Sequence, residues 1–193
     1  MNDYYQADEA EYYSRRPHTQ LPHTRKGVVY KRQSTHEQRR KRRHSLEMQG
    51  DLKRIAIEDF GYGEDQVIVI DKDLGISGTL REEDRPGLAE LLQLIRDNQI
   101  EVVFVVKPDR LYRDQTLVGP LDFALECQKY DVYVIYLDYG GPAIIDFNND
   151  NDFEDWVRMS QESAKELKNM QIRMGGARFY KAQSGKYVGT TIH

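Results

Sequence analysis

The sequence predicts an α/β fold, in which a mostly parallel sheet of four to five strands carries helices on both faces and is followed by a long C-terminal interface helix. Two observations support this prediction. Apolar runs typical of buried strands alternate with segments of helical periodicity, and such alternation produces parallel strands. Later in the chain, residues 152–174 contain neither glycine nor proline, which predicts one long helix.

The regular pattern begins at Gly27. Continuous apolar runs predict four strands, at residues 27–31, 66–70, 102–106 and 132–137. Apolar residues at helical spacing predict three helices between them, at residues 45–60 with Ser45 as the N-cap, 88–95 and 117–130.

These elements set the expected domain boundaries. Residues 1–26 hold four tyrosines, two prolines, two histidines and scattered charges without periodicity, so we expect a disordered or loosely attached arm. The α/β domain is expected over residues 27–150, the long helix over 151–185 and an exit linker over 186–193.

Charge is distributed unevenly along the chain. The formal net charge is −4, but residues 25–54 hold 11 Lys and Arg against 3 Asp and Glu, so this window carries +8 and the rest −12. Only a local site can therefore attract a polyanion. The densest part is a run of five cations that we expect to bind DNA phosphates without reading sequence: Arg39, Arg40, Lys41, Arg42 and Arg43. A nuclear-targeting signal is the alternative interpretation.

Composition excludes several classes of protein. No window approaches the roughly 18–20 apolar residues of a membrane span, and residues 1–10 lack the features of a secretory signal. We therefore expect a cytoplasmic protein and not a membrane protein. Cys127 is the only cysteine, which excludes an internal disulfide and a cysteine-based zinc site, and its apolar surroundings predict a buried packing role.

Polar side chains follow the predicted first strand. Because side chains alternate along a strand, Tyr30, Arg32 and Ser34 should lie on one side, at the sheet edge where parallel strands present ligands. Taken alone, Ser34 is more readily explained as a helix cap than as a nucleophile.

A second polar cluster follows the strand at residues 102–106. Arg110 and Arg113 should share a helical face beside Asp109, and two guanidinium groups suit the oxygens of a phosphodiester. An ion pair at the protein surface is the alternative. Arg85 and Asp73 follow the strand before it, so charged residues from three strand ends should meet at one rim.

The long helix has an apolar or small seam close to a heptad repeat. A helix of this length cannot bury its whole face on a small domain, so we expect part of it to pack against a partner subunit or DNA. A solvated helix that caps the sheet is the alternative. The predicted interface residues are Phe153, Trp156, Ser160, Ala164, Leu167, Met170 and Met174.

Several motifs occur together in one order. They are Y-x-R-x-S at residues 30–34, Gln38, S-L-E-x-Q at 45–49, D-x-G-I-S-G from Asp73, R-P-G-L from Arg85, and D-R-L-x-R at 109–113. With them the chain resembles, over about residues 27–189, the catalytic domain of serine recombinases, the resolvase and invertase group. It is most similar to the large serine integrases and transposases.

The resemblance implies a function. Ser34 would attack a DNA phosphodiester and form a 5′-phosphoserine bond without a metal or cofactor, while Arg32, Arg110, Arg113 and Arg85 neutralise the transition state. Asp109 would position arginines or move a proton. The resemblance assigns supporting roles to Tyr30, Gln38, Gln49 and Asp73.

The resemblance also implies partners. They are DNA, a second copy in a homodimer and a tetramer at synapsis, in a bacterial or phage-encoded, nucleoid-associated protein. Few residues follow Gly185, so we expect an isolated catalytic domain without its DNA-reading module.

Three other interpretations stay open. One is a catalytically idle, recombinase-like interaction or regulatory module. Another is a phosphate-binding signalling domain that accepts phosphate on Asp71 or Asp73, and a third is a Ser-His mechanism that uses His36 or His44.

Overall fold

The computed structural model describes residues 21–34, 52–77, 79–80, 82–112, 116–138 and 141–184. Within these ranges, the side chains of residues 33, 34, 178, 181 and 182 are outside the description.

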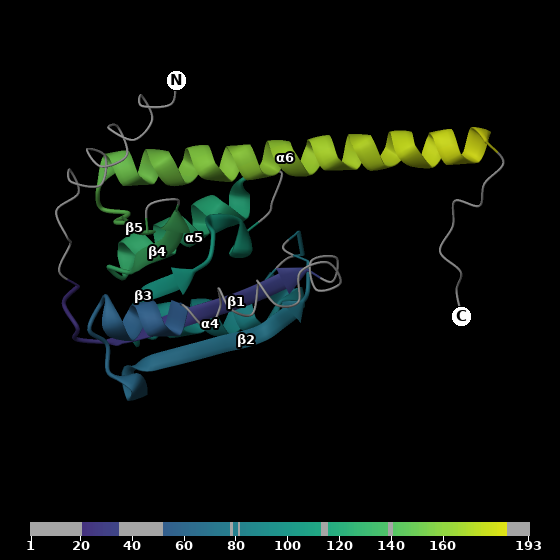
Figure 1. Ribbon diagram of the computed structural model, residues 1–193. Helices are drawn as coiled ribbons and strands as arrows, with labels where there is room; N and C mark the ends of the chain where they lie inside the picture. Colours follow the sequence, from purple (N-terminus) through teal and green to yellow (C-terminus); the bar gives the residue numbers. More distant parts are fainter. Residues whose placement is uncertain are drawn as a thin grey trace, which may run out of the picture.

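A five-stranded sheet forms the centre of the domain (Figure 1). Its order is β2-β1-β3-β4-β5, and the first four strands are parallel while β5 runs antiparallel to β4. The strands are β1 (Lys26–Ser34), β2 (Val67–Gly75), β3 (Ile100–Val105), β4 (Tyr133–Asp138) and β5 (Gly141–Ile145). The predicted mostly parallel sheet is confirmed.

Helices cover both faces of this sheet, as predicted. The α-helices are α4 (Pro86–Arg96), α5 (Val118–Lys129), α6 (Asp150–Gln183) and one at residues 52–58. Short 3-10 turns are η1 (Glu64–Gln66), η2 (Glu82–Asp84) and η3 (Pro108–Arg110).

The larger part of the core lies between the sheet and helices α4, α5 and α6. Buried leucine and isoleucine side chains of α4, spaced at three and four residues, pack there with Val103 of β3 and Phe123 of α5. Cys127 is fully buried in this cluster, which confirms its predicted packing role, and burial raises the pKa of its thiol.

The second half of the core lies on the opposite face. Leu52 and Ala56, one helical turn apart, bury themselves against Val29 and Phe104 of the sheet. Every residue of β3 is buried, as expected for a central strand covered on both sides.

The end of the predicted N-terminal arm is part of the domain. Leu21 is 5% exposed and belongs to the second core cluster. The carboxylate of Glu101, itself fully buried, accepts hydrogen bonds from the backbone N–H groups of Thr24 and Arg25 at 3.0 and 3.1 Å. The prediction of a disordered or loosely attached arm over residues 1–26 is therefore wrong for its last residues, because their N–H groups donate hydrogen bonds to a buried carboxylate.

Arg25 adds a second attachment. Its guanidinium donates to the carbonyl oxygens of Tyr130 and Asp131 at the end of α5, both at 2.9 Å. A cation at the C-terminal end of a helix is favourable, because unpaired carbonyl groups gather there.

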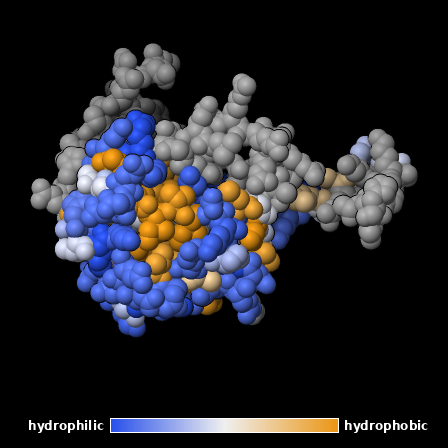
Figure 2. Space-filling view, turned by 90° about the horizontal axis from the view of Figure 1, so that it is seen from below, coloured by the Kyte–Doolittle hydropathy of each residue, from blue (hydrophilic) through white to orange (hydrophobic). Residues whose placement is uncertain are grey.

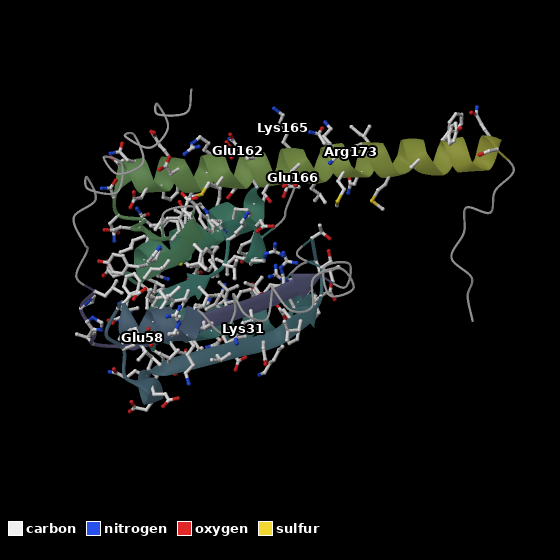
Figure 3. The ribbon with its side chains drawn as sticks, in the orientation of Figure 1. Lys31, Glu58, Glu162, Lys165, Glu166 and Arg173 are labelled. Atoms are coloured by element: carbon white, nitrogen blue, oxygen red, sulfur yellow. The ribbon has the colours of Figure 1, made fainter. Side chains whose placement is uncertain are left out.

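Helix α6 extends well past the sheet (Figure 1). Its first half packs against α5 and η3, whereas Ile172, Phe179 and Tyr180 farther along are 63%, 65% and 73% exposed. Figure 3 shows the charged side chains of Glu162, Lys165, Glu166 and Arg173 along the middle of the helix. No helix in the described part of the chain combines the length and the apolarity that crossing a membrane requires.

Trp156 of α6 corrects one part of the predicted interface. It is 1% exposed in the domain's own core, where it packs on Phe123 and Phe147, and its indole N–H donates to the Pro120 carbonyl at 2.9 Å. At this position, the predicted interface residue on α6 contacts its own domain and not a partner. Leu167 is also buried, at 5% exposure, and Met174 is 49% exposed.

Trp156→Phe should lower the free energy of unfolding by about 1–2 kcal/mol, because it removes buried apolar area and leaves the Pro120 carbonyl without its donor. Denaturant titration at protein concentrations about a hundredfold apart checks this. The loss should be equal at both concentrations, and a loss that grows on dilution would instead place Trp156 between subunits.

On the side of the molecule away from α6, the sheet ends in the edge strand β2. This side shows an apolar patch among hydrophilic residues (Figure 2). On β2, Val69 and Leu74 are 40% and 39% exposed.

Candidate active site

The carboxyl ends of β1, β2 and β3 meet at one edge of the sheet, as the parallel order requires. In the register of β1 with β2, Arg32 lies opposite Asp73, and Ser34 lies opposite Gly75. The backbone of Ser34 ends β1 at this edge, while its side chain is outside the described part.

A register shift places Asp73 in the site. Between Tyr30 and Arg32 on β1 there is one residue, but between their partners Ile70 and Asp73 on β2 there are two. An extra residue of this kind reverses the alternation of side chains that follow it. Asp73 therefore points inward and is fully buried.

Arg32 is held by main-chain oxygens. Its Nε donates to the Arg110 carbonyl at 2.7 Å and its Nη2 to the Asp109 carbonyl at 2.8 Å, with a longer contact of 3.4 Å to the Ile76 carbonyl. The side chain is buried, and burial lowers the pKa of its guanidinium to about 10, with the charges of Arg110 and Arg85 acting in the same direction. Arg32 thus still carries its charge at neutral pH.

A buried network joins Tyr30, Asp73 and Arg85. The Tyr30 hydroxyl donates to Asp73 Oδ2 and accepts from Arg85 Nη2 at 2.7 Å. Arg85 Nε lies 3.4 Å from Asp73 Oδ2, and both of these side chains are fully buried. Burial raises the pKa of Tyr30, so its hydroxyl remains a donor.

Asp73 also caps helix α4. Its carboxylate accepts the backbone N–H groups of Gly87 at 2.7 Å and Leu88 at 3.1 Å, which have no partner within the first turn of the helix. A Cβ at Gly87 would lie 2.9 Å from Asp73 Oδ1, so the close approach requires glycine. The R-P-G-L motif is explained by this junction.

The turn after β3 receives both arginines. Arg85 Nη1 donates to the Leu111 carbonyl at 2.6 Å, which follows the Asp109 and Arg110 carbonyls that Arg32 contacts. On the same turn, Arg110 Nε lies 3.5 Å from Asp109 Oδ1, and these two side chains are 18% and 20% exposed. The turn therefore presents a partly accessible Asp-Arg pair on a backbone whose carbonyl groups are hydrogen-bonded to Arg32 and Arg85.

The structure brings together most of the described residues that the sequence predicts for the site. The predicted common side of Tyr30 and Arg32 is confirmed, since both reach the network around Arg85. Among the predicted catalytic residues, Arg85 has no exposed surface. The remaining predicted residues lie outside the described part: Gln38, Gln49, Arg113, residues 39–43 and the histidines at 36 and 44.

Sequence reasoning missed the roles of main-chain groups. The carbonyls of Ile76 and Leu111 and the N–H of Gly87 all bind site residues. Gly87 between Pro86 and Leu88 was the one available signal, because glycine in the first turn of a helix indicates a close approach.

The placement of Asp73 conflicts with the idea of a phosphate-accepting aspartate. Its oxygens are enclosed and already bonded to four donor groups. Within the described ranges, no group of three or more His, Cys, Asp or Glu side chains is arranged to hold a metal ion.

Comparison with known proteins identifies the family. Residues 27–187 match the family model described as the N-terminal domain of resolvase. The fold is similar to the crystal structure of the N-terminal catalytic domain of TP901-1 integrase, with a TM-score of 0.51 and 23% identity over 75% of this chain and 98% of that chain. A search of curated proteins found no match. Since the family model covers most of the chain, including the strand ends described above, the chain belongs to the resolvase N-terminal domain family and contains a serine recombinase catalytic domain.

Proposed function

We propose that this domain cleaves and rejoins DNA strands with Ser34 as the nucleophile. The Ser34 oxygen would form a bond to phosphorus while the bond to the 3′-oxygen breaks, and a proton would pass to that oxygen. The products are a 5′-phosphoserine and a free 3′-hydroxyl. The reverse attack by a 3′-hydroxyl restores the DNA, so no external energy source is needed.

One observation carries the proposal: among the described residues, Arg32, two residues before Ser34 on β1, is hydrogen-bonded to carbonyl oxygens and not to a carboxylate. Its positive charge is thus not cancelled by a hydrogen-bonded carboxylate partner. Prepositioned charge of this kind stabilises a phosphoryl transition state, because no reorganisation is needed when negative charge develops.

Asp109 and Arg110 would complete the described part of the site. They stand on the turn that Arg32 holds and are partly accessible, so they can approach a bound phosphate. We propose that Arg110, with Arg113, binds the phosphate oxygens, and that Asp109 orients Arg110 or moves a proton.

The proposed partners follow from charge and exposure. We propose that the cationic run at residues 39–43 binds DNA phosphates near the cleavage point. We also propose that the exposed half of α6, with Ile172, Phe179 and Tyr180, contacts DNA or a second copy in a dimer that pairs into a tetramer at synapsis.

The test is covalent capture of DNA. The full chain is joined to a DNA-binding domain of known target and incubated with DNA that carries two targets around a mismatched centre. Digestion and mass spectrometry should find a nucleotide adduct on Ser34. The released ends should carry 3′-hydroxyls, and the reaction should persist in a metal chelator.

Ser34→Ala should give no adduct, and Thr35→Ala, which removes the neighbouring hydroxyl, should keep it. An adduct on another residue would reject Ser34 as the nucleophile. No adduct at several spacer lengths, with a folded protein, would favour the catalytically idle interaction module.

A further inference from the structure

We propose that Arg85 is a positioning residue, which fixes the turn that carries Asp109 and Arg110 and does not touch the DNA phosphate. The inference rests on the proposed function, since it divides the arginines of that site into two kinds. Arg32 and Arg110 would act on the phosphate, and Arg85 would act only through the protein.

Enclosure is the first argument. Arg85 is 0% exposed and lies with its Cζ 5.7 Å from the ring centroid of Tyr112. Arg110, in contrast, keeps 18% of its side-chain surface accessible. A phosphate can reach Arg110 without rearrangement of the core, whereas contact with Arg85 would require the packing around α4 to open. Arg32, at 4% exposure, is nearly as enclosed, so burial separates Arg85 from Arg110, and the charge of their partners separates Arg85 from Arg32.

Charge is the second argument. The Arg85 guanidinium is paired with the buried carboxylate of Asp73 and donates a hydrogen bond to the Tyr30 hydroxyl. Its charge is thus compensated inside the protein, so little of it acts on a nearby phosphate. Within the described part of the chain, the hydrogen bonds of Arg32 go to carbonyl oxygens, which carry no net charge, although the Asp109 carboxylate acts on it at longer range.

The hydrogen bonds of Arg85 show what it does hold. Nη1 donates to the Leu111 carbonyl at 2.6 Å, and Nη2 lies 3.4 Å from the Arg110 carbonyl. Asp73 in turn fixes the start of α4, on which Arg85 stands as the N-cap residue. Arg85 therefore ties the turn after β3 to β1, β2 and α4 at once.

The planar fork of arginine is needed for this role. Three different nitrogens point to partners on three segments, and a lysine ammonium has the charge but not the geometry. Arg85→Lys therefore separates the two functions, because it keeps the charge and loses the hydrogen-bonding pattern.

The first experiment uses DNA with a neutral methylphosphonate at the cleaved position, with the full chain in the format of the capture assay. Loss of an arginine that neutralises phosphate charge should matter less on this substrate, because the charge is gone. Arg32→Ala should therefore recover at least about tenfold relative to ordinary DNA. Arg85→Lys and Arg85→Ala should cleave both substrates slowly, by the same factor relative to the unchanged protein.

Recovery of Arg85→Ala on the neutral substrate, equal to that of Arg32→Ala, would overturn the inference and leave the proposed function standing. Arg96→Lys, a change at an exposed arginine of the same helix, is the matched control and should behave as the unchanged protein on both substrates.

The second experiment needs no DNA, so it decides the inference even if the proposed function fails. Amide hydrogen exchange is measured on the full chain. The N–H groups of Arg110 and Leu111, bonded to Lys107 and Pro108 within the turn, should exchange at least about fivefold faster in Arg85→Lys. Exchange in β3 should stay unchanged, which separates release of the turn from general unfolding.

Tyr30→Phe provides a second variant if Arg85→Lys does not fold. It removes one partner of Arg85 and keeps the ring in the core, so exchange of the same two amides should rise by about twofold to fivefold. Unchanged exchange at Arg110 and Leu111 in a variant that lacks the Arg85 contacts would overturn the inference.

Discussion

Asp73→Ala should lower the free energy of unfolding by about 3–5 kcal/mol. The substitution leaves the fully buried Arg85 without its counter-charge and removes the acceptor for the Gly87 and Leu88 amides and for the Tyr30 hydroxyl. Because domains are stable by only about 5–15 kcal/mol, a loss of this size should be visible as a large shift in a urea titration.

Asp71→Ala is the matched control for this prediction. Asp71 lies on the same strand, two residues earlier, with its side chain exposed. Its replacement should change stability by less than about 0.5 kcal/mol. Equal effects of the two substitutions would contradict the buried network.

Arg32→Ala should slow strand cleavage by about 100- to 1,000-fold, because one prepositioned donor for the developing charge is lost. The measurement is the single-turnover rate of adduct formation on Ser34, in protein whose folding has been checked by denaturant titration. Folding must be checked because the same substitution removes donors from the carbonyls of Asp109 and Arg110.

Lys31→Ala is the control for a general loss of positive charge. Lys31 is the neighbouring residue on β1, and it lies on the sheet away from α6 (Figure 3). Adjacent residues on a strand point to opposite faces, so its replacement should leave the cleavage rate within about twofold. A similar loss for both variants would point to long-range charge and not to a specific contact of Arg32.

The sequence predicts the sheet well because its strands carry strong local signals. The apolar runs of β2, β3 and β4 and the periodic leucines of α4 all lie where the pattern predicts them. Strand β5 is short, contains Pro142 and follows β4 closely, so its pattern did not stand out as a strand of its own.

The errors arise where burial depends on residues far apart in the chain. The docking of residues 21–25 depends on Glu101, which lies 77 positions from Thr24. Helix periodicity identified the apolar face of α6, but it could not tell that Trp156 meets Phe123 and Phe147 of its own domain. Periodicity gives the face of a helix and not the surface that covers it.

The sequence predicts which residues form the candidate site, but it does not predict which of them act on the phosphate and which position other residues. Motif order placed Tyr30, Arg32, Asp73 and Arg85 near one sheet edge, and the structure brings them together. The enclosure of Arg85 could not be read from the sequence, because its partners lie on several segments and one of them, Asp73, is turned inward by the extra residue in β2.

Arg32 and Arg85 hold the turn after β3 by its carbonyl oxygens at residues 109, 110 and 111. A carbonyl oxygen is present whatever side chain its residue carries. These hydrogen bonds to the turn therefore do not depend on which side chains stand at 109 and 110, so evolution or protein engineering can vary the chemistry displayed there and still keep these contacts.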